Sequence, residues 1–183
     1  MASNTTGASN TAIGRSALYS NTTASNNTAV GYQASYTGTT AANNTSVGYK
    51  ALYSNLAGAE NTAIGNYALY NNTNNDNSAF GFNALYTNSS GYYNTAMGAY
   101  AMYTNNGINN TGIGVNALYY NTTGGSNTAL GSEALKSNTT ASYNTAVGWQ
   151  AGYANTTGAE NSAFGAGALK NATTANYNVG VGN

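Results

Sequence analysis

Residues 10–19 read Asn-Thr-Ala-Ile-Gly-Arg-Ser-Ala-Leu-Tyr, and close copies of this stretch recur along the whole chain. Each copy opens with a five-residue unit. Its first residue is Asn, its second is Thr or Ser, its third is small, its fourth is apolar and its fifth is Gly. The copies start at Asn10, Asn27, Asn44, Asn61, Asn77, Asn94, Asn110, Asn127, Asn144 and Asn161, with a degenerate copy at Asn178. Successive starts are 17 residues apart in eight of ten intervals and 16 apart in the other two. This regularity predicts one structural turn per repeat.

Two columns of the repeat are predicted to form the core. The fourth position of each unit is a larger apolar residue, and we expect it to be a core stripe: Ile13, Val30, Val47, Ile64, Phe80, Met97, Ile113, Leu130, Val147 and Phe164. Three residues beyond each Gly comes an invariant Ala, where we expect room only for a methyl group: Ala17, Ala34, Ala51, Ala68, Ala84 and Ala101, continuing to Ala168. A column that is mostly Leu follows directly.

A period of 17 residues suits a β-solenoid better than a pair of packed helices. Helical repeats are longer, and Asn, Thr, Gly and Tyr are mediocre or poor helix formers. We expect Asn-Thr-Ala-Ile-Gly to be a short strand with a Gly corner, x-Ala-Leu-Tyr to be a second short strand, and the polar run to return the chain to the next coil. The prediction is an all-β protein: a β-solenoid (β-roll) of about ten 17-residue coils with two short strands per coil. Residues 1–9 would be an N-terminal lead-in and 10–183 a single solenoid domain.

Stacked coils would place equivalent residues in ladders. Adjacent coils should lie about 4.8 Å apart, which gives a rod on the order of 50 Å long. The Asn that opens each repeat, and a second Asn column represented by Asn21 and Asn55, would exchange amide hydrogen bonds along the rod. No polar cap is evident at either end of the sequence, so exposed strand edges would favour end-to-end polymerisation, or the chain would be part of a longer shaft.

The composition argues against several functional classes. The 183 residues include four Lys or Arg and four Asp or Glu, which sum to a net charge of zero, and there is no His or Cys. We therefore expect no nucleic-acid binding, because a basic stripe is needed to neutralise phosphates. No segment approaches the length of a membrane span, so membrane insertion is not expected. The few acids are scattered and no His can act as a base, so we expect no catalytic residues, no metal, no cofactor and no enzymatic activity.

A column of tyrosines follows the Leu column and is the most suggestive candidate for binding: Tyr19, Tyr36, Tyr53, Tyr70, Tyr86, Tyr103, Tyr119 and Tyr153. A packing ladder inside an oligomer interface or along the rod is the favoured interpretation, because aromatic pairs stabilise each other. The alternative is that the ring faces stack on a surface glycan.

Two further columns of polar residues have weaker functional interpretations. Asn-x-Thr/Ser triplets, including those at Asn21 and Asn138, match glycosylation acceptors but also arise by chance in such a chain. Regularly spaced Thr residues such as Thr28 and Thr45 form a column like the Thr arrays of ice-binding solenoids. Strand alternation places Thr on the same side as the apolar column, which we expect to point inward, so ice binding is the least favoured alternative.

Residues 10–14, 27–31 and 161–165 read Asn-Thr-Ala-Ile-Gly, Asn-Thr-Ala-Val-Gly and Asn-Ser-Ala-Phe-Gly. These units resemble the head repeats of trimeric autotransporter adhesins and the similar repeats of phage tail-fibre-like proteins, over about residues 10 to 182. The resemblance implies a β-roll, commonly trimeric, in an extracellular, cell-surface or virion fibre that provides reach and attachment. The expected function is therefore a non-catalytic structural protein that forms a fibre with itself. A glycan- or receptor-binding shaft is the second hypothesis.

Overall fold

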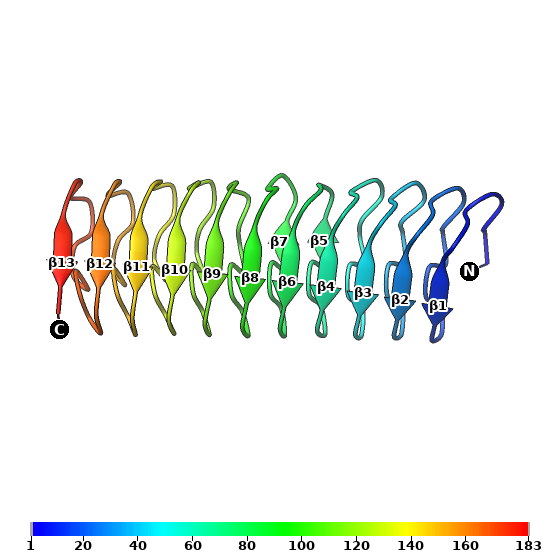
Figure 1. Ribbon diagram of the computed structural model, residues 1–183, viewed down its shortest axis with the longest axis horizontal. Helices are drawn as coiled ribbons and strands as arrows, with labels where there is room; N and C mark the ends of the chain where they lie inside the picture. The colour runs from blue at the N-terminus through cyan, green and yellow to red at the C-terminus, as the bar shows by residue number, and fades with distance from the viewer. Residues whose placement is uncertain (1, 183) are drawn as a thin grey trace.

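In the computed structural model, which describes residues 2–182, the chain forms a straight stack of coils (Figure 1). One strand of each coil joins an eleven-stranded parallel sheet in the order β1-β2-β3-β4-β6-β8-β9-β10-β11-β12-β13. Its strands are β1 (Thr11–Ile13), β2 (Thr28–Val30), β3 (Thr45–Val47), β4 (Thr62–Ile64), β6 (Ser78–Phe80), β8 (Thr95–Met97), β9 (Thr111–Ile113), β10 (Thr128–Leu130), β11 (Thr145–Val147), β12 (Ser162–Phe164) and β13 (Val179–Val181). Equivalent residues pair, as in Thr11 with Thr28. The predicted all-β solenoid is confirmed.

The second β segment of each coil lies slightly later in the repeat than expected. It is regular enough to be a strand in β5 (Asn71–Asn72) and β7 (Thr87–Asn88), which pair in parallel. The other coils are joined by similar backbone bonds, such as Ser20 N–H to Tyr36 C=O at 3.1 Å. The preceding x-Ala-Leu stretch is a turn, because the Leu column is left-handed, with φ of 49° at Leu85. Such a backbone is unusual for a bulky residue, and the packed stack holds it in place.

The predicted core stripe is wrong, because the large apolar side chains point out of the solenoid. Ile13 is 59% exposed and Met97 45%. The same outward row contains Val30, Val47, Ile64, Phe80, Ile113, Leu130, Val147 and Phe164, all exposed or half-buried. The middle residue of each strand points inward instead, as Ala29, Ala63 and most of its equivalents do with no exposure. Since side chains alternate along a strand, the inward turn of this Ala forces both neighbours outward.

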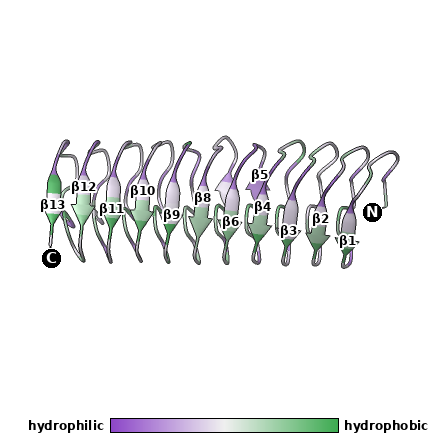
Figure 2. Ribbon diagram, viewed as in Figure 1, coloured by the Kyte–Doolittle hydropathy of each residue, from purple (hydrophilic) through white to green (hydrophobic). Residues whose placement is uncertain are grey.

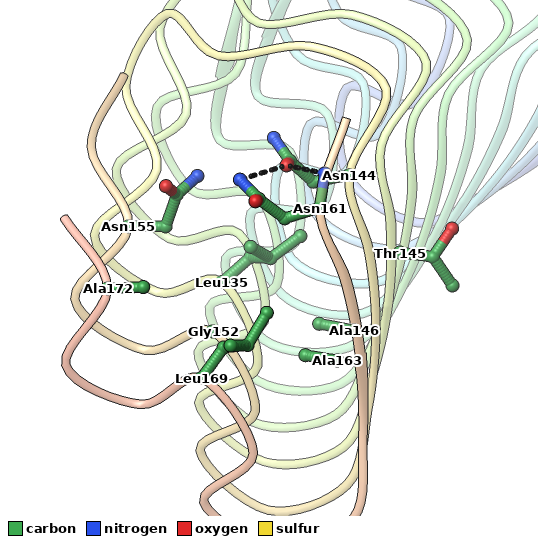
Figure 3. A pocket seen from close by; sticks show the side chains of 10 residues that line it. All are labelled: Leu135, Asn144, Thr145, Ala146, Gly152, Asn155, Asn161, Ala163, Leu169 and Ala172. Carbon is green, nitrogen blue, oxygen red and sulfur yellow. Dashed lines mark hydrogen bonds between the residues drawn. The ribbon is translucent and has the colours of Figure 1, made fainter. Parts of the chain in front are cut away.

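The interior is narrow, and Leu fills it from the opposite wall. The invariant Ala column is buried as predicted: Ala17, Ala34, Ala51, Ala68, Ala84 and Ala101 are at most 1% exposed. The next residue is also buried, and it is Leu after four of these alanines, Met102 after Ala101 and Ser35 after Ala34. The Leu and Met side chains pack against the Ala of the sheet strands. In Figure 3, Ala146, Ala163, Leu135 and Leu169 point into this interior, whereas Thr145 points away from it. Methyl groups on the sheet side therefore leave space for one Leu per coil.

We expect Ala84→Leu to lower the free energy of unfolding by about 1–3 kcal/mol, because extra carbons in a filled interior force neighbouring coils apart. Ala84 has no exposed surface and lies within the core cluster. Urea denaturation followed by circular dichroism would measure the change. Thr123→Ser, at an exposed turn position, is the control and should be nearly silent. Equal tolerance at the two positions would contradict this interior.

The opening Asn column connects each coil to the next through the backbone. Asn94 Oδ1 accepts the N–H of Asn110 at 3.0 Å, and Asn94 Nδ2 donates to the carbonyl of Gly107 at 2.9 Å. Equivalent bonds to the backbone N–H recur in every coil from Asn10 to Asn178. The side chains from Asn27 to Asn161 are buried, so each supplies partners to polar backbone groups that water does not reach. Asn is retained at the start of a strand for this reason.

The second Asn column forms the amide ladder that the sequence predicts. Asn138 Nδ2 donates to Asn121 Oδ1 at 2.8 Å, and Asn155 Nδ2 donates to Asn138 Oδ1 at 2.9 Å. Gly38 interrupts the column in the second coil, and on the N-terminal side of this break Asn4 Oδ1 accepts from Asn21 Nδ2 at 2.9 Å. The expected lead-in therefore already contacts the next coil from residue 4 onward. Figure 2 shows the polar return runs as hydrophilic along the rod and the strand ends beside the Gly corner as hydrophobic.

Candidate functional site

Seven tyrosines form one continuous stack along the rod, which we call the Tyr ladder: Tyr19, Tyr36, Tyr53, Tyr70, Tyr86, Tyr103 and Tyr119. Their ring centroids are 5.1–5.2 Å apart and their planes differ by 3–11°. Lys136 takes the next position in the column, and its Nζ lies 5.6 Å from the ring centroid of Tyr153. Tyr153 is therefore separated from the stack by the lysine.

The stacking determines which part of each tyrosine a ligand can reach. Each ring within the ladder is covered on both faces by its neighbours, so edges and hydroxyls remain accessible. The expectation that free ring faces stack on sugars does not hold for the interior of the ladder, and the packing interpretation fits its geometry. Desolvation by burial raises the pKa of Tyr86 and of Tyr119 above the usual value. These hydroxyls therefore remain protonated hydrogen-bond donors at neutral pH.

Other aromatic side chains and one lysine flank the ladder. Tyr67 meets Tyr70 edge to face, with ring centroids 5.5 Å apart and planes at 63°. Lys50 Nζ lies 5.5 Å from the ring centroid of Tyr49 and 5.3 Å from that of Tyr53. Burial opposes the charged form of Lys50, but electrostatic interactions with the neighbouring tyrosines outweigh it and raise the pKa. Lys50 is therefore a positive charge held against an aromatic wall.

Two open hollows lie beside the Tyr ladder. The first, which we call the Lys50 hollow, has a volume of about 330 Å³ and is lined by Lys50, Tyr67, Tyr70, Phe82, Asn83, Tyr86 and Tyr103. The second, the Lys136 hollow, has about 350 Å³ and is lined by Tyr100, Asn116, Tyr119, Tyr120 and Lys136. Both combine aromatic rings, an amide and an ammonium group. This composition suits a polar ligand with an anionic group and some apolar surface.

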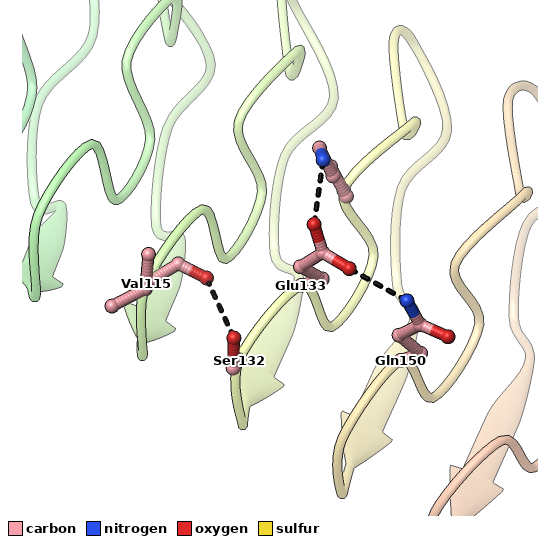
Figure 4. A network of polar contacts seen from close by, with 5 residues as sticks. Val115, Ser132, Glu133 and Gln150 are labelled. Atoms are coloured by element: carbon pink, nitrogen blue, oxygen red, sulfur yellow. Dashed lines mark hydrogen bonds and ion pairs between the residues drawn. The ribbon is translucent and has the colours of Figure 1, made fainter.

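The two lysines differ in how their charge is balanced. Lys136 Nζ lies 2.6 Å from Glu133 Oε1, and Gln150 Nε2 donates to Glu133 Oε2 at 2.6 Å (Figure 4). The hydrogen bond from Lys136 is the main cause that lowers the pKa of Glu133. Within residues 2–182 this is the one ion pair. Lys50 has no such partner, so its charge is available to a ligand.

The outward rows of the eleven-stranded sheet form a second surface, which we call the outer sheet face. It carries the Thr or Ser that begins each strand and the apolar residue that ends it, for example Thr95 and Met97 of β8. The expectation that the Thr column points inward is therefore wrong, for the same reason as for the apolar column. No charged side chain belongs to either row. The face is a regular array of hydroxyl, methyl and larger apolar groups.

The interior cavity of about 10 Å³ near the C-terminal end is a packing defect (Figure 3). Gly152 stands where most other coils have Leu, and Ala172 stands where most other coils have the second Asn. Asn155 Oδ1, which would accept from that Asn, is buried without a partner. The missing side chains therefore explain the cavity, which is too small to hold more than about one water molecule.

We expect Ala172→Asn to raise the free energy of unfolding by about 0.5–1.5 kcal/mol, because the new amide would donate to Asn155 Oδ1 and extend the buried ladder. Thermal or urea denaturation would measure the gain. Ala172→Leu tests the alternative that filling space is enough, because it adds volume but no donor. A larger gain from Leu than from Asn would contradict the hydrogen-bond explanation.

Several glycosylation triplets lie where a glycan cannot be attached to the folded chain. Asn21, Asn88, Asn121, Asn138 and Asn155 are buried, and their amides bond within the second Asn column or to nearby carbonyls.

Across residues 2–182 the side chains form no cluster of three or more candidate metal ligands. The same part of the chain has no helix that is long and apolar enough to cross a membrane. Comparison with known proteins finds no matching family, curated protein or solved structure.

Proposed function

We propose that this chain is a non-catalytic structural protein that forms an extracellular fibre by stacking of solenoid coils, with adhesion as a secondary role. The observation that carries this proposal is the continuity of contacts along the rod axis. Backbone bonds, two Asn columns and the Tyr ladder all join equivalent positions of neighbouring coils. Each coil thus offers the next one the same surface, and every added coil contributes a further stabilising contact.

The same surface can accept coils from another copy of the chain. β1 and β13 each have one sheet neighbour, so each keeps one row of backbone groups for a further parallel strand. Stacking in register would also continue the outer sheet face and the Asn columns from copy to copy. We propose a cell-surface or virion location as well, which the resemblance of the repeats to adhesin heads and tail-fibre-like proteins supports.

Electron microscopy of the purified chain tests the proposal. We expect unbranched filaments with an axial spacing of about 4.8 Å between coils. Val179→Lys and Val181→Lys, which place two outward-pointing lysines on the edge strand β13, should reduce filament length because lysine on an edge strand disfavours pairing with a further strand. Glu160→Lys, at an exposed turn, is the control. Compact, dispersed monomers under all conditions would refute the assembly.

Ice binding is the second candidate function, and the orientation of the outer sheet face favours it. Thr28, Thr45 and their equivalents point outward from a parallel sheet in which equivalent residues pair in register. A regular array of hydroxyl and methyl groups can order water in a repeating pattern. Thermal hysteresis measures this activity directly. Thr95→Arg at the middle of the face should abolish it, Thr123→Arg at a turn should not, and a native chain without hysteresis excludes this function.

A further inference from the structure

We propose that the side of the rod with the Tyr ladder binds an extended anionic polysaccharide of β-linked uronic acid residues. Lys50 would hold a carboxylate, and the hydroxyls of Tyr70, Tyr86 and Tyr103 would donate to sugar oxygens. This site lies on the side of the stack rather than at its ends, so it goes beyond the fibre function and does not depend on filament assembly.

The first line of argument is the geometry of the tyrosine hydroxyls. The rings of Tyr70, Tyr86 and Tyr103 are 5.1 Å apart and nearly parallel, so their hydroxyls form a row with similar spacing. All three tyrosines are half-buried and line the open Lys50 hollow. Their spacing is close to the length of one residue in an extended β-1,4-linked sugar chain. Because successive sugars in such a chain are rotated by about half a turn, every second sugar can meet every second hydroxyl in the same relation, and the sugars between them present their opposite edge.

The second line of argument is the charge. Lys50 is held beside Tyr49 and Tyr53 without an acidic partner, whereas Lys136 is paired with Glu133. The two hollows are on the same ladder, and Lys50 and Lys136 are about five coils apart, which is roughly 24 Å along the rod. An extended hexasaccharide has about this length. Its carboxylates would meet the unneutralised ammonium of Lys50 at one end and reach the Lys136 hollow at the other.

The third line of argument is the apolar wall of the Lys50 hollow. Phe82 is 42% exposed, and Tyr67 meets it edge to face with ring centroids 6.5 Å apart. Tyr67 is fixed further by its contact with Tyr70. Such rings suit the C–H surfaces of a sugar ring. A compact anion such as inorganic phosphate would contact Lys50 but leave both the wall and the row of hydroxyls unused.

Isothermal titration of the full chain with a β-1,4-linked hexauronate tests the proposal. We expect the carboxyl-reduced, neutral hexasaccharide to bind about tenfold or more weakly. Lys50→Gln should weaken hexauronate binding about tenfold, and Tyr86→Phe, which keeps the stacked ring, about threefold. Lys170→Gln is the matched control, since Lys170 Nζ lies 5.3 Å from the ring centroid of Trp149 and outside both hollows. Thermal melting verifies that each variant is folded.

Three results would overturn the proposal. These are no binding of the hexauronate, equal binding of the acidic and neutral sugars, and full affinity in Lys50→Gln and Tyr86→Phe. Linear polyphosphate serves as a probe of charge alone, and if it competes as strongly as the hexauronate, the site is a general anion surface and the sugar assignment is wrong. Electron microscopy of the same samples reports filament formation separately, so failure of binding and failure of assembly are distinguished.

Discussion

Gly98→Ala is expected to lower the free energy of unfolding by about 2–6 kcal/mol, the sum of about 1–3 kcal/mol of backbone strain and about 1–3 kcal/mol of overpacking. Gly98 has φ of +134°, a conformation that residues with a Cβ rarely adopt. A Cβ at this position would lie 2.6 Å from the carbonyl oxygen of Gly114 in the next coil. Because that atom belongs to the backbone, the clash cannot be relieved by a side-chain rotation.

Gly125→Ala provides the matched control for this substitution. A Cβ on Gly125 would have the Ile108 carbonyl oxygen as its nearest neighbour, at 3.2 Å, and the backbone there is not in the left-handed region. We expect a change within about 1 kcal/mol, since the lower flexibility of the unfolded chain offsets a slightly tight contact. Urea denaturation of both variants measures the difference. Similar stabilities would show that the corner does not require glycine.

Asn94→Ala is expected to destabilise the protein by about 2–5 kcal/mol, because it leaves a buried backbone N–H without an acceptor, removes a donor from a buried carbonyl and opens a cavity. The N–H is that of Asn110, at 3.0 Å from Asn94 Oδ1, and the carbonyl is that of Gly107, which lies 2.9 Å from Asn94 Nδ2 and keeps its bond from Asn105 Nδ2. Native-state hydrogen exchange should also show faster exchange of the Asn110 amide. Asn171→Ala, at an exposed position, changes the same side chain and should be nearly neutral.

Asn94→Asp separates the two roles of the amide. The carboxylate keeps an acceptor for the Asn110 N–H but places a second oxygen against the Gly107 carbonyl. Burial raises the pKa of such a carboxyl above its value in the unfolded chain, so the variant should become less stable as the pH rises through the folded pKa and regain stability at lower pH. A stability that does not change between low and neutral pH would contradict this role of Nδ2.

Most of the fold could be predicted from the sequence because the repeat is nearly exact. The spacing of the opening Asn residues fixes the number of coils, and the invariant Ala before a mostly Leu column correctly identifies part of the interior. The seven-membered Tyr ladder follows from the same register. The left-handed Leu positions could not be predicted, because a bulky residue in that conformation contradicts local preference and is stable only within the stack.

The candidate binding surfaces could be predicted from the sequence only in part. The Tyr column alone did not reveal that stacking covers the ring faces. The hollow beside Lys50 is formed with residues from three other coils, including Tyr67, Phe82 and Tyr103. The sequence signal for this site was the presence of a lysine and aromatic residues at neighbouring positions of the repeat. Their convergence on one hollow is visible only when the coils are superimposed.

The sequence by itself determined that this chain is a parallel β-solenoid with one coil per repeat and with ladders of Asn and Tyr. It could not decide which face of each strand is buried, since Thr-Ala-Ile alternates equally well in either orientation. The tertiary structure placed Ala inside and Thr and the larger apolar residues outside. The physical reason is the width of the interior: Leu from the opposite wall fills it, and only a methyl group fits on the side of the sheet.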